Sequence, residues 1–295
     1  MTGVQTCALP ISRYCTLEGR NEVPDTLDAQ MVKDAGPLFN GGEKMQLQYN
    51  IRNTLRAIGT RLSAEITRRF GMTGLKPNHL TVRLRGSAGQ SLGAFAVQGV
   101  KLEVFGDAND YVGKGLSGGT IVVRQMPSSR LNGNEHTIIG NTVLYGATAG
   151  RLFASGQAGE RFAVRNSGAL TVVEGCGSNG CEYMTGGMAV ILGAVGENFG
   201  AGMSGGMAFI YDEEGLFPLR ANPDTIVWQR LDSEYWEDRL RLMVEEHAAE
   251  TQSRFAGRLL NDWQLERGKF WQVVPKEMLS RLEQPLSDRP AAARA

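Results

Sequence analysis

The sequence lacks several features that would place a protein in a narrow class. Four cysteines in 295 residues are too few for a disulfide framework, so a reducing, cytoplasmic setting is expected. No apolar run approaches the ~20 residues that span a bilayer. The 31 basic residues balance the 31 acidic residues, so no net charge attracts the chain to nucleic acid or to a membrane surface.

The first residues of the chain differ in character from the rest. Residues 1–11 have no basic start and too short an apolar core for a secretory signal. They resemble the translation of a common short-read sequencing adapter, so residues 1–12 are interpreted as non-native. On this interpretation Cys7 has no biological role, and the chain is a fragment whose reading frame continues upstream of Arg13.

Glycine is the residue in excess, at 38 positions against only ten prolines, which is about twice the usual share of ~7%. Most of it lies within residues 79–211, where a landmark residue precedes each short β-rich run about every 19 residues. A polar loop at residues 126–136 lengthens one interval. The landmarks are His79, Gly99, Gly119, Gly150, Ala169, Gly187 and Gly206. The residues three positions later are all apolar: Val82, Leu102, Val122, Phe153, Val172, Val190 and Phe209.

A period of this length is typical of a parallel β-helix. Ordering ~20 residues costs on the order of 20–40 kcal/mol of backbone entropy, and two or three inward aliphatic side chains return only about 5–9 kcal/mol. The repeats must therefore stack to be stable. We expect a mainly β fold, a right-handed parallel β-helix of about seven coils with N- and C-terminal α-helical segments covering its ends. A leucine-rich-repeat solenoid is the alternative for this period, but its Leu/Asn signature is absent.

The glycines are expected at corners that need positive φ or close backbone approach. Gly186 and Gly205 are expected to be two such tight corners, where valine would impair folding. Four segments follow from the pattern: residues 1–12 (non-native), 13–78 (linker and amphipathic capping helix), 79–218 (glycine-rich β-helix) and 219–295 (C-terminal helical cap and tail).

Two helical patterns flank the repeats. Before them, apolar residues recur every three or four positions, as one helix face requires, and Gly71 supplies a stop signal. This face comprises Ile51, Leu55, Ile58, Leu62, Ile66 and Phe70. Five arginines give the same helix a basic side, read as solvated or facing an acidic neighbour: Arg52, Arg56, Arg61, Arg68 and Arg69. The second pattern comprises Trp236, Leu240, Met243 and His247, then Phe255, Leu259 and Trp263.

Three glycine runs match the dinucleotide-binding pattern G-x-G-x-x-G, beginning at Gly113, Gly175 and Gly200. A true fingerprint must open a helix whose N-terminus meets the pyrophosphate. Each run here leads within a few residues into another glycine pair or strand, so we interpret all three as corners of the repeat.

Other candidate chemistry is sparse. Cys176 and Cys181 have half of an iron–sulfur spacing without further cysteines nearby, and are interpreted as structural thiols. No metal site is expected from three widely separated histidines, His79, His136 and His247. Asp107 and Asp110 do not recur as a calcium-binding roll requires. We therefore assign no catalytic, cofactor-binding or metal-binding residue.

Outward positions bear mixed charges, which indicates a solvated or docking face: Lys101, Glu103, Arg151 and Glu160. A free-standing β-helix enzyme acting on polysaccharide, which would gather charges of one sign on an outer face, stays open as an alternative.

Several stretches resemble the glutamate synthase large (α) subunit family, and the match runs from Arg13 to Leu286. They include residues 19–28, Arg85-Gly-Ser-Ala-Gly-Gln-Ser-Leu-Gly-Ala-Phe95, residues 106–119, Glu174-Gly-Cys-Gly-Ser-Asn-Gly-Cys-Glu-Tyr-Met184 and residues 268–278. The resemblance is to the family's C-terminal glycine-rich (GXGXG) β-helix domain, in its bacterial, NADPH-using form. A similar β-helix occurs in one of the subunits of formylmethanofuran dehydrogenase, but the segments at residues 21–24 and 271–275 favour glutamate synthase.

The resemblance implies a reaction for the parent enzyme: glutamine, 2-oxoglutarate and reductant give two glutamates in ammonia assimilation. It implies FMN and a 3Fe–4S cluster in the parent, and NADPH, FAD and 4Fe–4S clusters through a small (β) subunit. The family's catalytic and cluster residues lie upstream of this region, and no position here matches them. The implied role is structural, holding the amidotransferase and FMN-binding domains of the parent chain in place, with no cofactor bound by this region.

Overall fold

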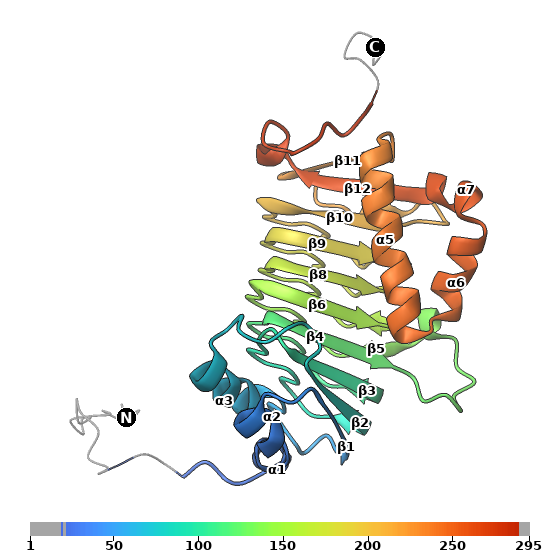
Figure 1. Cartoon of the computed structure of the whole chain (residues 1–295). Helices are drawn as coiled ribbons and strands as arrows, with labels where there is room; N and C mark the ends of the chain where they lie inside the picture. The colour runs from blue at the N-terminus through green and yellow to red at the C-terminus, as the bar shows by residue number, and fades with distance from the viewer. Residues whose placement is uncertain (1–18, 20–21, 289–295) are drawn as a thin grey trace, which may run out of the picture.

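The computed structural model describes residue 19 and residues 22–288 (Figure 1). The interpretation of residues 1–12 as non-native falls outside this part of the chain. A single sheet runs through the molecule, and its strands follow one another in the order β1-β2-β3-β4-β6-β8-β9-β10-β12-β11. Their bounds are Met45–Ile51, Leu80–Ala88, Val100–Ala108, Ser117–Arg124, Ala149–Ala154, Ser167–Val173, Thr185–Ile191, Gly205–Tyr211, Phe270–Pro275 and Ile226–Arg230.

The prediction of a mainly β, right-handed parallel β-helix of about seven coils is wrong. The fold is mixed α/β, and its main feature is a 12-stranded, mostly parallel sheet. The sheet is parallel from β1 to β10, but β12 joins β10 and β11 joins β12 in antiparallel fashion. Off this path, the described residues contribute only two short strands, β5 (Thr137–Ile139) and β7 (Gln157–Ala158), and isolated bridges.

The backbone of the connecting segments explains why they do not form further long strands. Residues with positive φ alternate with residues whose φ is not positive, as at Tyr111, Gly113 and Gly115, with φ of 62°, 66° and 62°. Extended backbone does not tolerate this alternation, so the segments turn. The Tyr111 N–H still donates to the Asn141 carbonyl and the Gly113 N–H to the Leu92 carbonyl, so neighbouring repeats remain joined. The same alternation occurs at Ser91, Gly93 and Phe95, at Thr142, Leu144 and Gly146, at Arg161, Ala163 and Arg165, at Asn179, Cys181 and Tyr183, and at Asn198, Gly200 and Gly202.

Strand register follows the predicted repeat at every step but one. Val82 lies opposite Leu102. From β4 to β10 the predicted residues are paired on neighbouring strands, in a continuous row from Val122 to Phe209. Between β3 and β4, however, Leu102 pairs with Ile121, one residue before the predicted partner. Such a slip moves a side chain to the other face of the sheet. Leu102 and Ile121 accordingly belong to one core cluster, and Val122 and Phe209 to another.

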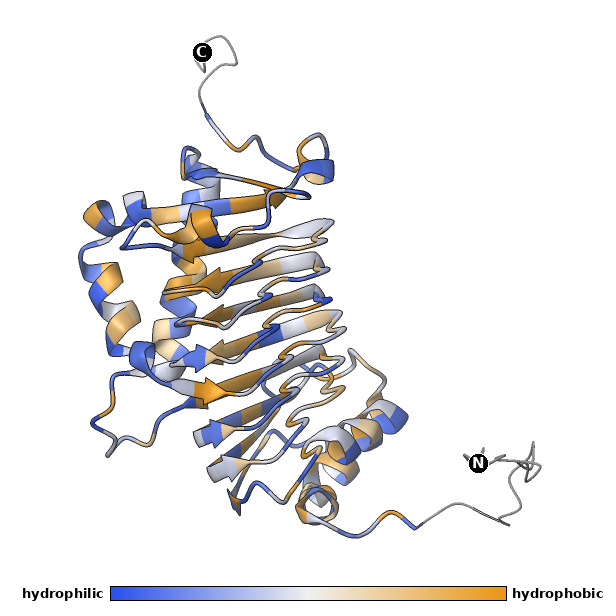
Figure 2. Cartoon of the chain, turned by 180° about the vertical axis from the view of Figure 1, so that it is seen from behind, coloured by the Kyte–Doolittle hydropathy of each residue, from blue (hydrophilic) through white to orange (hydrophobic). Residues whose placement is uncertain are grey.

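The second core cluster forms between the sheet and a helical layer, whose α5 and α6 mix hydrophobic and hydrophilic stretches (Figure 2). This layer comprises α5 (Glu234–Thr251), α6 (Arg254–Asn261) and α7 (Trp263–Glu266). The predicted stripe on α5 is confirmed, because Trp236, Leu240, Met243 and His247 are all buried. We expected this segment to cover an end of the repeats, but α5 lies across β4, β6, β8 and β9 (Figure 1). Within the described residues, no helix has the length and hydropathy to cross a membrane.

The helix predicted to begin near Ile51 is shorter than expected. Ile51 ends β1, and α3 spans Thr60–Phe70 after Gly59, whose φ is 98°. Its end before Gly71 is confirmed. The remaining α-helices are α1 (Leu27–Asp34), α2 (Gly36–Gly41) and α4 (Phe217–Arg220). Short 3₁₀ turns lie at Gly133–Glu135, Arg267–Lys269 and Lys276–Met278.

A buried carboxylate joins α1 to α3. Asp28 is 4% exposed, and its carboxylate accepts the Arg61 N–H at 2.8 Å and the Leu62 N–H at 3.3 Å. These are first-turn donors that the helix itself cannot satisfy. Burial raises the pKa of the Asp28 carboxyl, although these backbone N–H groups and Arg61 oppose the rise.

Replacing Asp28 with alanine should lower the free energy of unfolding by about 2 kcal/mol, because both N–H groups lose their acceptor. Asp28→Asn keeps an oxygen acceptor and removes the buried charge, so its loss should stay below about 1 kcal/mol. Chemical denaturation of both variants measures the difference. Equal losses for alanine and asparagine would show that capping contributes nothing.

Candidate functional site

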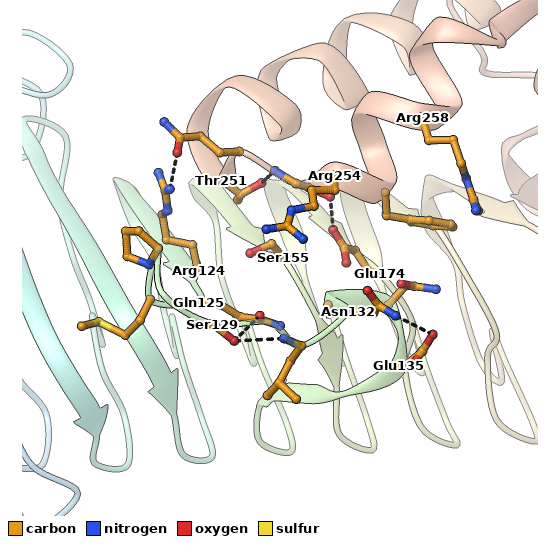
Figure 3. Close-up of a pocket in the computed structure, with 18 residues that line it drawn as sticks. Arg124, Gln125, Ser129, Asn132, Glu135, Ser155, Glu174, Thr251, Arg254 and Arg258 are labelled. Carbon is orange, nitrogen blue, oxygen red and sulfur yellow. Dashed lines mark hydrogen bonds between the residues drawn. The ribbon is translucent and has the colours of Figure 1, made fainter.

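A cavity lies beyond the carboxyl ends of strands β4, β6 and β8. It has a volume of about 440 Å³, and its walls come from three parts of the chain (Figure 3). These are the strand ends, the polar loop at residues 126–136 (the insert loop) and the corner between α5 and α6. A second cavity of about 230 Å³ adjoins it and shares Glu174, Asn134, Phe255 and Arg258 with it. The carboxyl ends of parallel strands are a common place for ligands in α/β folds.

A buried carboxylate stands between the two cavities. Glu174 directly follows β8 and is 1% exposed. Its Oε1 accepts a hydrogen bond from the Ser253 hydroxyl and lies 3.3 Å from His247 Nε2. Ser253 in turn caps α6, since its Oγ accepts the Ala256 N–H at 3.0 Å. Glu174 therefore connects the end of a strand to the start of α6 and to α5.

The glutamate, histidine and serine do not form a hydrolytic triad. A nucleophilic serine needs its hydroxyl hydrogen-bonded to the imidazole, which removes its proton. Here Ser253 bonds to Glu174 instead, and His247 Nδ1 is buried without a hydrogen-bond partner among the described residues. Ser253 and His247 are both buried. This arrangement positions α6 and does not activate a nucleophile.

Three arginines line the larger cavity: Arg124, Arg254 and Arg258. Arg124 donates to Gln252 and lies over the Phe105 ring, and its Nε is buried with no hydrogen-bond partner in the described part of the chain. Within residues 22–288, no carboxylate forms an ion pair with any of these three arginines. Guanidinium groups that lack a carboxylate partner are suited to bind oxyanions.

The three glycine runs lie where the sequence predicted. The run from Gly113 leads into β4, the run from Gly175 into the turn before β9, and the run from Gly200 into β10. None of them opens a helix, so their interpretation as turns of the repeat is confirmed. The left-handed backbone at Gly113 and Gly200 accounts for glycine at these positions.

The two described cysteines, Cys176 and Cys181, are buried in the first core cluster. Burial raises the pKa of the Cys176 thiol to about 12 and that of the Cys181 thiol well above its usual value. An iron–sulfur cluster usually takes four cysteine thiolates, and the described residues offer only these two, so this pair by itself does not fit a cluster. In the region that the structure describes, no three His, Cys, Asp or Glu side chains are grouped as a metal site would require.

The outward charges serve the fold more than the sequence suggested. Lys101 and Arg151 form ion pairs with Glu250 and Glu246 of α5, and Glu103 pairs with Arg83 at 2.9 Å. Two of these pairs thus attach α5 to the sheet. On the basic helix, Arg68 and Arg69 pair with Glu65, and Arg61 pairs with Asp25.

Sequence reasoning did not single out the residues of this site. Glu174 was noted only as the start of a motif, and the insert loop only as extra length. The site joins Glu174 to residues 73 and 79 positions later in the chain. No local pattern marks contacts over such a separation.

Comparison with known proteins gives consistent relatives. The model of the GXGXG motif family matches residues 28–276. The chain is 71% identical over 275 residues to the glutamate synthase [NADPH] large chain of Azospirillum brasilense, covering 93% of this chain and 18% of that protein. It is 45% identical over 269 residues to the corresponding large chain of Bacillus subtilis, covering 90% and 18%. It is 48% identical over 227 residues to ferredoxin-dependent glutamate synthase 2 of Synechocystis sp., covering 77% and 14%. The chain thus spans less than a fifth of the length of these relatives.

Proposed function

The chain belongs to the GXGXG motif family, and we propose that it forms this domain in a glutamate synthase. The observation that carries the proposal is the 71% identity over 275 residues to a glutamate synthase large chain. The parent enzyme would make two glutamates from glutamine, 2-oxoglutarate and reductant. This similarity favours glutamate synthase over formylmethanofuran dehydrogenase and over a polysaccharide-active enzyme.

Within that parent, the domain is structural. The uninterrupted strand path from β1 to β11 supports this role, because a continuous hydrogen-bonded ladder resists deformation. Such a body can hold an amidotransferase domain and an FMN-binding domain at a fixed separation. The buried polar cluster at Glu174 also supports this role, because Ser253 caps α6 and is hydrogen-bonded to Glu174.

The cofactors belong to other parts of the assembly. FMN and a 3Fe–4S cluster would lie in upstream domains, and NADPH, FAD and 4Fe–4S clusters would act through a small subunit in the cytoplasm. The NADPH type rests on the 71% identity to the Azospirillum brasilense large chain alone, because the NADPH large chain of Bacillus subtilis is 45% identical and the ferredoxin-dependent enzyme of Synechocystis sp. 48%. We retain 1–12, 13–78, 79–218 and 219–295 as the proposed segments of the chain.

A chimera tests the proposal. Residues 28–276 should replace the matching segment of the Azospirillum brasilense large chain with retention of NADPH-dependent glutamate formation. The isolated 295-residue chain should show no flavin or iron–sulfur absorbance and should release no ammonia from glutamine. A folded chimera that binds FMN but makes no glutamate would contradict the assignment, as would glutaminase activity in the isolated chain. Genomic DNA upstream of the Arg13 codon should encode an FMN-binding domain.

A further inference from the structure

The cavity beside Glu174 contains groups of both charges. Arg124, Arg254 and Arg258 contribute three positive charges, and Glu135 and Glu174 contribute two negative ones. The surplus is one positive charge. A ligand of matching charge therefore carries a net charge of −1 and includes both an anionic group and a cationic one.

The positive side of the cavity comes mainly from α6. Arg254 is the first residue of this eight-residue helix and Arg258 lies one turn later, in its last turn, and both side chains are exposed. Among the described residues no carboxylate forms an ion pair with Arg254, and Arg258 interacts electrostatically with Glu266 without forming an ion pair. Arg124 adds a buried Nε without a hydrogen-bond partner in the same part of the chain. Guanidinium groups and a helix N-terminus both favour carboxylate oxygens.

The negative side is the buried carboxylate. Glu174 uses Oε1 for Ser253 and His247, whereas its Oε2 has no hydrogen-bond partner among residues 22–288. Oε2 is not among the buried atoms that lack a partner, so it is accessible from the cavity although the side chain as a whole is only 1% exposed. Figure 3 shows the Glu174 and Arg254 side chains reaching into the space between α6 and the insert loop. A donor placed there would satisfy Oε2.

We propose that this cavity binds an acidic α-amino acid, with its carboxylates on Arg254, Arg258 and Arg124 and its ammonium on Glu174 Oε2. L-aspartate and L-glutamate have the required net charge and one ammonium. A volume of about 440 Å³ is sufficient for molecules of this size. The proposal rests on the cavity alone and does not depend on the parent enzyme of the chain.

Calorimetric titration of the full chain tests the proposal. L-aspartate or L-glutamate should bind with a Kd of about 0.1–1 mM. Glutarate, which has two carboxylates and no ammonium, should bind about tenfold more weakly or not at all. Equal affinity for glutarate or inorganic phosphate would reduce the site to a nonspecific anion patch and overturn the proposal. Absence of saturable binding to any of the probes would also overturn it.

Two variants separate the roles of the charges. Arg254→Gln should weaken binding of the amino acids about tenfold, whereas Arg239→Gln, an exposed arginine on α5, should leave the affinity unchanged. Glu174→Gln should weaken the amino acids but not glutarate, because only the ammonium contacts this side chain. If Glu174→Gln does not fold, Arg254→Gln still tests the binding mode, because a substitution at the exposed Arg254 should not disturb folding. An unchanged affinity in Arg254→Gln would exclude this mode of binding.

Discussion

Replacing Gly205 with alanine should prevent the chain from folding stably. A Cβ at this position would lie 2.1 Å from the Thr185 carbonyl oxygen and 2.6 Å from its carbonyl carbon. Both atoms are backbone, and Thr185 is held opposite Gly205 in the parallel ladder between β9 and β10. Neither strand can move away without breaking that ladder. The expected loss is more than about 4 kcal/mol, a large part of the stability of an ordinary domain.

Thermal and chemical denaturation of Gly205→Ala measure this loss. Gly257→Ala is the matched control, because Gly257 lies inside α6 and an added methyl group would meet nothing within 4 Å. The free energy of unfolding of this control should rise by about 0.5–1 kcal/mol, because alanine favours the helix more than glycine does. Gly186→Ala should resemble Gly205→Ala, because its Cβ would lie 2.3 Å from the Ser167 carbonyl oxygen. A Gly205→Ala chain with an unchanged midpoint would contradict the close approach of these strands.

Truncation of Phe209 to alanine should cost about 3–5 kcal/mol of unfolding free energy. Its ring is fully buried in the second core cluster, between the sheet and the layer of α5, α6 and α7. Phe209 ends the row of paired residues that begins at Val122 and faces the helical layer. Removing the ring leaves a cavity that a helix attached by ion pairs and a rigid sheet cannot close.

Phe95→Ala provides the same chemical change on the surface. The Phe95 side chain is 54% exposed, so its loss should cost roughly 1 kcal/mol or less. Both Phe95 and alanine must adopt the left-handed backbone there, with φ of 57°, so backbone strain is similar. Urea denaturation of the two variants should separate them by at least ~2 kcal/mol. Equal losses would mean that the helical layer does not depend on the packing of Phe209.

The repeat was readable from the sequence because its signals are local. A landmark residue, a short β-rich run and a turn recur within about 19 residues, and strand order and most of the register follow from that spacing. The slip at Leu102 was not readable, because Ile121 and Val122 are both apolar and either could face inward. Only pairing between β3 and β4 decides which of them does.

The fold class was misread for a related reason. The spacing of glycines shows how often the chain turns, but not whether the residues between turns are extended. The left-handed conformation of non-glycine residues such as Tyr111, Arg161 and Tyr183 keeps the connections from becoming strands. These residues carry side chains that a sequence pattern assigns to ordinary backbone. Hydrogen bonds to neighbouring repeats hold them in this conformation.

The sequence by itself determined the family, the repeat, the buried stripe of α5 and the absence of a helix after each glycine run. The tertiary structure alone decided that α5 covers a face of the sheet, that charged positions anchor it, and that Glu174 meets Ser253 and His247 beside unpaired arginines. The physical reason is the separation along the chain of the residues that interact. Periodicity and turn preference act between neighbours in the chain, whereas burial and ion pairing act between residues that only folding brings together.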